Sequence, residues 1–162
     1  MSLFQTLVDP SARQKDPTRI RETLLYIEKA NFTADADFVY QFPPMEKVVR
    51  IDLVEMAIRG VPTTGGRSDY PYYSVEFDRL PVNSVASNSL NGRILVPLEG
   101  VDSRRSYSEG FVIRKGDVPM DLYEIRTRVY RSDNRVATST DIDSIVVVMR
   151  VYQDLGAQGW GA

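Results

Sequence analysis

Pairs of carboxylates are the side chains in this sequence whose type and spacing could do chemistry. Three pairs stand two residues apart: Asp35 with Asp37, Asp141 with Asp143, and Glu76 with Asp78. This spacing places both acids on one side of an extended chain, where two aspartates could bind Ca²⁺ and a Glu–Asp pair could imitate a glycosidase. The simpler interpretation is that the pairs lie in solvated loops and on the solvent side of a strand. We therefore assign no catalytic or metal-binding residue.

The sequence contains no His and no Cys among its 162 residues. General-base catalysis most often uses His, thiol catalysis needs Cys, and zinc sites of the Cys/His type need these same ligands. Residues 63–68 (TTGGRS) include two glycines but lack the Lys of a phosphate-binding P-loop. We predict a protein that is not an enzyme and uses no cofactor. An enzyme that works with oxygen ligands alone is the remaining catalytic alternative.

Two clusters could instead bind a partner. An arginine row, formed by Arg126, Arg128, Arg131 and Arg135, could contact phosphate or an acidic partner, although the acidic residue Glu124 shares its strand face. This mixture of charges favours a solvated or interface surface over a phosphate site.

The second cluster is aromatic and follows a polar loop. Arg67, Tyr70, Tyr72 and Tyr73 could form the recognition tip of a ligand-binding protein. The alternative is that these tyrosines pack in the core and at strand edges. The sequence leaves both roles open.

The composition is that of one globular domain. Hydrophobic residues make up 43% of the chain, charged residues make up 26%, and the net charge is −2. This balance argues against a dedicated nucleic-acid-binding protein, whose affinity depends on neutralising phosphates. No apolar stretch approaches the roughly 20 residues that span a bilayer, and the first residues lack the pattern of a secretory signal. We expect no membrane span and no specific nucleic-acid partner. We also expect the protein to be made in a cell without carrying a secretory signal.

β-Strands must position these side chains, because apolar and polar residues alternate between turn residues along most of the chain. Eight segments have this pattern: residues 23–29, 37–42, 48–61, 73–77, 93–98, 111–115, 123–131 and 144–153. Pro43-Pro44 and Gly116-Asp117 are expected to end two of them, and residues 102–109 (DSRRSYSE) to form a charged loop. We predict an all-β fold, an antiparallel β-sandwich of the jelly-roll type with about eight strands.

Two of these segments allow alternatives. Residues 17–30 also fit a helix, because Asp16 could cap it and Pro17 suits its first position. In residues 48–61 the apolar positions change face near Leu53-Val54. A β-bulge there would return them to one face, whereas a strand covered on both sides would need no bulge.

The core is expected to include Val129, Ile145 and Val147. Residues 144–153 contain five consecutive apolar residues and predict a central strand buried on both faces. In residues 123–131, Tyr123 and Ile125 are expected to face inward with Val129.

The predicted β-sandwich domain covers residues 20–155, between an N-terminal arm of residues 1–19 and a glycine-rich tail of residues 156–162. Both ends carry large apolar side chains, which are Phe4, Leu7 and Val8 in the arm and Trp160 in the tail. Such anchors are typical of interface hot spots. We expect these residues to dock onto neighbouring subunits.

The order of several segments resembles that of structural proteins from large icosahedral double-stranded DNA viruses. The similar stretches are Leu25-Tyr26-Ile27-Glu28, residues 37–44 (DFVYQFPP), residues 45–62 (MEKVVRIDLVEMAIRGVP) and residues 119–129 (PMDLYEIRTRV), followed by the turn Ser132-Asp133-Asn134. The resemblance is one of pattern and order, and it covers about residues 24–151. It implies a jelly-roll-like minor capsid or vertex protein of the virion.

This resemblance implies a non-enzymatic structural role through protein–protein assembly, with other capsid proteins or further copies of the chain as partners. The rival hypothesis is a ligand-binding β-sandwich head that recognises a glycan or a receptor through the loop of residues 63–73. A glycan array would separate the two classes, because a pure capsid component should bind nothing on it.

Overall fold

The computed structural model describes residues 20–63, 69–80 and 92–156, and every regular element within these ranges is a β-strand. The strands are β1 (Ile20–Ala30), β2 (Asp37–Gly60), β3 (Tyr72–Phe77), β4 (Ile94–Pro97), β5 (Asp102–Arg131) and β6 (Ile142–Asp154). All pairings between them are antiparallel. The prediction of an all-β antiparallel fold is therefore confirmed. None of the described residues forms a helix long and apolar enough to cross a membrane.

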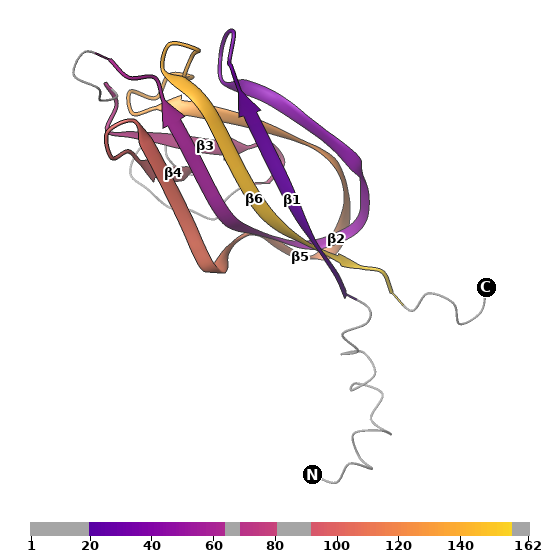
Figure 1. The fold of residues 1–162 in the computed structure, drawn as a ribbon. Coiled ribbons are helices and arrows are strands. Elements are labelled where there is room, and N and C mark those ends of the chain that lie inside the picture. Colours follow the sequence, from indigo (N-terminus) through magenta and orange to yellow (C-terminus); the bar gives the residue numbers. More distant parts are fainter. Residues whose placement is uncertain (1–19, 64–68, 81–91, 157–162) are drawn as a thin grey trace, which may run out of the picture.

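The six strands form one continuous sheet in the order β1-β6-β2-β5-β3-β4. Residues 50–60 of β2 lie between β6 and the first part of β5, whereas residues 37–48 pair with the second part of β5. Because β2 and β5 are long and bend, the sheet curls over on itself and encloses the core on its concave side (Figure 1). The structure thus has a single curled sheet.

The eight predicted segments correspond to these six strands, because two pairs of segments are joined. The predicted stop at Pro43-Pro44 is wrong, since β2 continues through it, and only its pairing lapses between Gln41 and Met45. Proline has no amide hydrogen to donate to a neighbouring strand, but its fixed φ suits extended backbone. Gly116-Asp117 likewise lies inside β5, where the pairing with β2 shifts.

The predicted charged loop of residues 102–109 is also wrong, because β5 begins at Asp102. Its first residues pair with residues 55–59 of β2. A charged sequence can form a strand here, because its charged side chains point into solvent and its backbone pairs with β2. Pairing with a distant segment, which local composition does not reveal, has overridden the loop-like sequence.

The β-bulge predicted near Leu53-Val54 is confirmed. The register of β2 shifts between Leu53 and Glu55 against both of its neighbours, β5 and β6. Ile51 and Leu53 before the shift and Met56 after it are all fully buried. One extra residue therefore turns the later part of β2 so that both apolar sets face the core.

The core contains the three residues expected there, since Val129, Ile145 and Val147 are fully buried. β6 lies between β1 and β2, as a central strand should. It is not fully buried on both faces, however, because Val146 and Val148 are only half-buried on its outer side. The apolar run therefore supplies the core on one side of the sheet and an apolar outer surface on the other.

Residues 20–30 form a strand, so the helical alternative is excluded. β1 pairs along its whole length with β6, and this pairing buries Leu25 and Ile27. In β5, Ile125 is buried as predicted, but Tyr123 is 49% exposed. The reason is that the buried residue before Ile125 is Leu122, so the alternation is broken within residues 122–125.

Candidate functional site

β1 is an edge strand, and in the part of the chain that the structure describes it pairs only with β6. Charged residues occupy both ends of β1, but residues 23–27 (TLLYI) carry no charge. On the outer side of this uncharged stretch, Leu24 is 46% exposed and Tyr26 is 59% exposed. Edge strands are normally protected by charges, prolines or bulges, because their unpaired backbone groups can bind another strand. Residues 23–27 in the middle of β1 include no charged residue and no proline.

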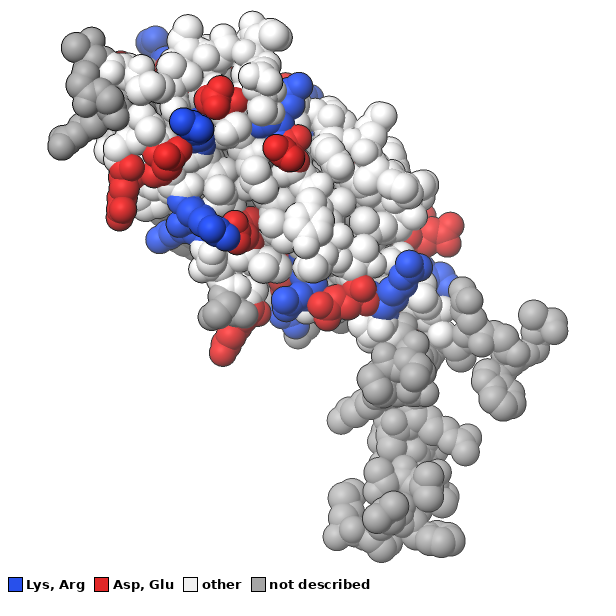
Figure 2. All heavy atoms as spheres, viewed as in Figure 1, with Lys and Arg blue, Asp and Glu red and all other residues white. Residues whose placement is uncertain are grey.

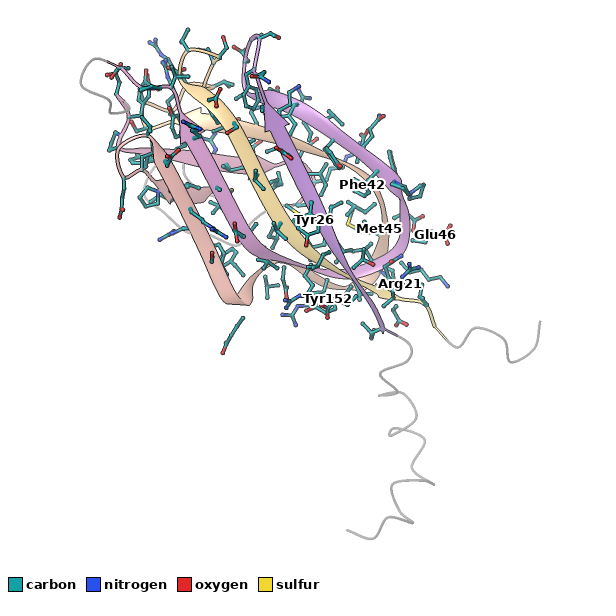
Figure 3. The ribbon with its side chains drawn as sticks, in the orientation of Figure 1. Arg21, Tyr26, Phe42, Met45, Glu46 and Tyr152 are labelled. Carbon is teal, nitrogen blue, oxygen red and sulfur yellow. The ribbon has the colours of Figure 1, made fainter. Side chains whose placement is uncertain are left out.

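A groove of about 460 Å³ lies between β1 and the bend of β2 at Pro43-Pro44. We call it the edge groove and define it by the lining residues Leu24, Tyr26, Tyr40, Phe42 and Met45. Figure 3 shows Tyr26 on β1 and Phe42 and Met45 on the facing part of β2. Its volume is within the range of roughly 300–1,000 Å³ that is usual for binding pockets.

The wall of the edge groove on β2 is aromatic, and a hydrogen bond from β6 holds the adjoining bend of β2 in place. The rings of Tyr40 and Phe42 are stacked with their centroids 6.2 Å apart. Gln153 of β6 is buried and donates a hydrogen bond from Nε2 to the carbonyl oxygen of Glu46, at 2.8 Å. This bond ties the end of β6 to the bend of β2 just beyond the two prolines. The wall is therefore preorganised for apolar side chains.

The rest of the outer face next to the groove carries charges in pairs of opposite sign. The pairs are Glu22 with Arg150 at 3.0 Å, Glu55 with Arg104 at 2.9 Å and Arg59 with Asp102 at 3.7 Å. Figure 2 shows acidic and basic groups lying next to each other on a surface that is otherwise mostly uncharged. A face of this kind can dock against a protein, because its charges do not repel a partner of either sign.

One ion pair on this face has a buried carboxylate and a partly exposed arginine. The Arg50 Nε and Nη2 atoms donate to Asp52 Oδ1 and Oδ2, both at 2.8 Å, and Asp52 is completely buried. The hydrogen bonds to Asp52 raise the pKa of Arg50. The guanidinium also lies 5.3 Å from the centre of the Tyr152 ring. Because its partners lie within the protein, this pair has a structural role.

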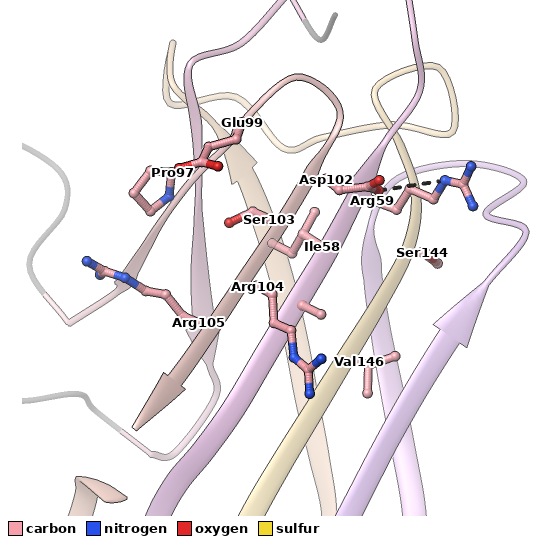
Figure 4. Close-up of a pocket in the computed structure, with 11 residues that line it drawn as sticks. Ile58, Arg59, Pro97, Glu99, Asp102, Ser103, Arg104, Arg105, Ser144 and Val146 are labelled. Atoms are coloured by element: carbon pink, nitrogen blue, oxygen red, sulfur yellow. Dashed lines mark ion pairs between the residues drawn. The ribbon is translucent and has the colours of Figure 1, made fainter. Parts of the chain in front are cut away.

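A second hollow, of about 660 Å³, is lined by residues of β2, β5 and β6 (Figure 4). Arg59, Arg104 and Arg105 line it. Besides the ion pairs of the first two, Arg105 Nη1 donates to the carbonyl oxygen of Leu95 at 3.1 Å. All three guanidinium groups therefore have partners within the protein. Glu99 and Asp102 also line the hollow and Glu55 pairs with Arg104, so three carboxylates balance the three positive charges and leave no surplus that would favour an anionic ligand.

Two arginines of the row, Arg126 and Arg128 on β5, are paired with carboxylates of the neighbouring strands. Arg126 Nε and Nη2 donate to Asp37 at 2.7 Å, and Arg128 Nε donates to the same carboxylate at 3.1 Å. Arg128 also reaches Glu76 at 3.4 Å. These hydrogen bonds lower the pKa of Asp37 below its usual value of 3.8, and the bond from Arg126 has the largest effect. Partial burial of Asp37 opposes them by raising the pKa. Asp37 is thus engaged in ion pairs rather than poised for Ca²⁺.

The same network extends across β3. Arg93 lies with its guanidinium carbon 3.5 Å from the centre of the Tyr130 ring and reaches Glu76 at 3.4 Å. The Tyr130 hydroxyl donates to Glu76 at 3.3 Å. The mixed-charge surface predicted for this strand is therefore present as a linked series of ion pairs, which stabilises the contact of β2, β5 and β3.

The tyrosine cluster packs against the protein. Tyr73 is completely buried, and its hydroxyl donates to the carbonyl oxygen of Asp141 at 2.7 Å. The Tyr72 hydroxyl donates to the carbonyl oxygen of Ser132 at 3.4 Å, and the Tyr70 ring lies 6.0 Å from that of Tyr73. Of the two roles that the sequence left open, Tyr73 takes packing in the core, because a buried tyrosine needs an acceptor for its hydroxyl and finds it in the domain. Tyr70 and Tyr72 are half-buried beside it.

The other predicted site residues lie outside the described residues. They are Phe4, Leu7 and Val8 of the arm, Trp160 of the tail, and Arg67 of the loop. The residues of the edge groove were not selected from the sequence. The signal that could have found Leu24 and Tyr26 is the uncharged run of residues 23–27 in a strand near the end of the sheet.

Comparison with known proteins adds no family to this description. No protein-family model matches the chain, and no curated protein matches it.

Proposed function

We propose that this protein is a non-enzymatic structural component that acts through protein–protein assembly, with the edge groove as part of its assembly surface. The observation that carries the proposal is the middle of β1. Among the described residues this edge strand has a partner strand on one side only, and its uncharged stretch lies beside an aromatic wall. Adding a strand to such an edge satisfies its backbone groups, and side-chain pockets beside the edge give specificity. Leaving it uncovered would invite unspecific aggregation.

The resemblance to minor capsid and vertex proteins supports placing this assembly role in a virus particle. Its partners there would be further copies of the chain and other capsid proteins. The paired charges of the outer face also support a structural role, because they offer complementarity to a protein partner without an excess of either sign.

The test compares two tyrosine substitutions by sedimentation of the purified chain over a range of concentrations. Tyr26→Asp places a charge at the edge groove, and Tyr123→Asp places the same charge at a similarly exposed tyrosine of β5. We expect the unaltered chain and Tyr123→Asp to self-associate and Tyr26→Asp to remain monomeric, with all three melting at similar temperatures. A chain that stays monomeric at every concentration, or equal association of both variants, would contradict the proposal.

A further inference from the structure

We propose that the edge groove receives residues 3–8 of a second copy of this chain, which add to β1 as an extra strand. This inference rests on the proposed function, because it assumes that copies of the chain associate. It goes further by naming which segment fills the groove and which copy supplies it.

The receiving side has the two features that strand addition requires. In the described part of the chain, β1 has a neighbour on one side only, so the backbone groups on its other side are available. Leu24 and Tyr26 of β1 line the groove together with Phe42 and Met45 of β2, and Figure 3 labels Tyr26, Phe42 and Met45 there. An incoming strand could therefore bond to the backbone of β1 and place alternate side chains against the aromatic wall.

The proposed occupant matches this edge in length and chemistry. Residues 3–8 (LFQTLV) carry no charge, four of the six are large and apolar, and none is Gly or Pro. Six residues of strand span about 20 Å, close to the roughly 17 Å of the uncharged stretch of residues 23–27. Leu3 and Leu7 would lie on one side of the added strand and Phe4 and Val8 on the other, so either side can fill the groove.

The linker is long enough for the segment to reach a second copy. Residues 9–19 join the segment to β1. Extended, eleven residues reach about 35 Å, which is enough to arrive at an adjacent molecule. The proposed association of copies brings a second β1 within this reach, and on that ground we assign the segment to the groove of the neighbouring copy.

Engineered disulfides can test this pairing, because the chain has no cysteine of its own. Gln5→Cys serves as the donor and Leu24→Cys as the acceptor in the edge groove. The control acceptor is Leu95→Cys, a leucine 37% exposed on β4, the strand at the opposite edge of the sheet. Donor and acceptor proteins are mixed under mild oxidation, and the heterodisulfide is measured by mass spectrometry.

We expect the heterodisulfide with Leu24→Cys to exceed that with Leu95→Cys by at least about ten-fold, since docking raises the local concentration of the donor thiol. Adding Tyr26→Asp to the acceptor should remove this excess. Equal yields at the two acceptors would overturn the inference. So would a double variant, Gln5→Cys with Leu24→Cys, that forms its disulfide within one chain at high dilution.

Sedimentation of the unaltered chain separates this inference from the proposed function. If copies associate but the two acceptors give equal yields, the groove is filled by something other than residues 3–8, and only the inference fails. If the chain stays monomeric and no heterodisulfide forms, the inference and the proposed function fail together.

Discussion

Asp52 on β2 lies directly against Gly110 on β5, so closely that a Cβ added at Gly110 would come 3.0 Å from Asp52 Cβ and 3.2 Å from Asp52 Oδ2. Gly110 also has a φ of +79°, a conformation that L-residues rarely adopt. The absence of a side chain here lets the Asp52 carboxylate be completely buried beside Arg50. Two strands of the outer face are thereby fitted to each other through one glycine.

We predict that Gly110→Ala destabilises the protein by about 2–3 kcal/mol, through backbone strain and the clash with Asp52. Gly100→Ala is the matched control, because Gly100 has a φ of +74° but open space around the added Cβ. The control should show the backbone cost alone, about 1–2 kcal/mol. Urea unfolding of both variants measures the difference, and equal losses of stability would show that the contact with Asp52 costs nothing.

Val147→Asp should cost more than about 4 kcal/mol, because it places an unpaired charge in the buried side of a central strand. Val146→Asp, one residue earlier, puts the same charge on the outer side, in the hollow that Arg104 lines. We expect that variant to lose about 1 kcal/mol or less. Thermal unfolding followed by circular dichroism compares them, and near-unaltered melting of Val147→Asp would show that β6 faces the other way.

We expect the stability that the ionised Asp37 contributes to be lost in acid. Its pKa is lower in the folded protein than the usual 3.8, so its contribution is complete above about pH 3.8 and is lost as pH falls through the folded pKa. Asp37→Asn should therefore cost about 1 kcal/mol near neutral pH and progressively less in stronger acid. Urea unfolding at a series of pH values tests this, with the exposed Asp143→Asn as control. A penalty that does not shrink in acid would contradict the assigned ion pairs.

Deleting Val54 and Glu55 together should be far more damaging than deleting Val54 alone. Removing Val54 takes away the extra residue of the bulge and leaves Leu53 and Met56 two positions apart, so regular alternation keeps both on the core face. Removing both residues makes Leu53 and Met56 direct neighbours, so one of them must turn away from the core together with its apolar neighbours. We expect the single deletion to cost about 1–2 kcal/mol and the double deletion more than about 4 kcal/mol. Thermal melting and protease resistance measure both, and equal stability of the two variants would mean that the register of β2 can slip freely.

Alternation in the sequence by itself determined the class of fold and much of the core. The side-chain period of a strand is local, so the pattern within residues 37–42 or 144–153 shows which residues share a face without knowledge of their neighbours. The same reasoning located the bulge at Leu53-Val54, because a change of face within one apolar run has few other physical solutions. The burial of Val129, Ile145 and Val147 follows from it.

Only the tertiary structure decided where strands continue, which of the described strands lie at the edges of the sheet and which aromatic residues are enclosed. Whether Pro43-Pro44 ends a strand, or residues 102–109 form one, depends on a partner strand far away in the sequence. Tyr73 is buried because the turn containing Asp141 supplies an acceptor for its hydroxyl. The edge groove exists because the curled sheet brings the bend of β2 opposite β1. Each of these depends on long-range contacts, which local periodicity does not encode.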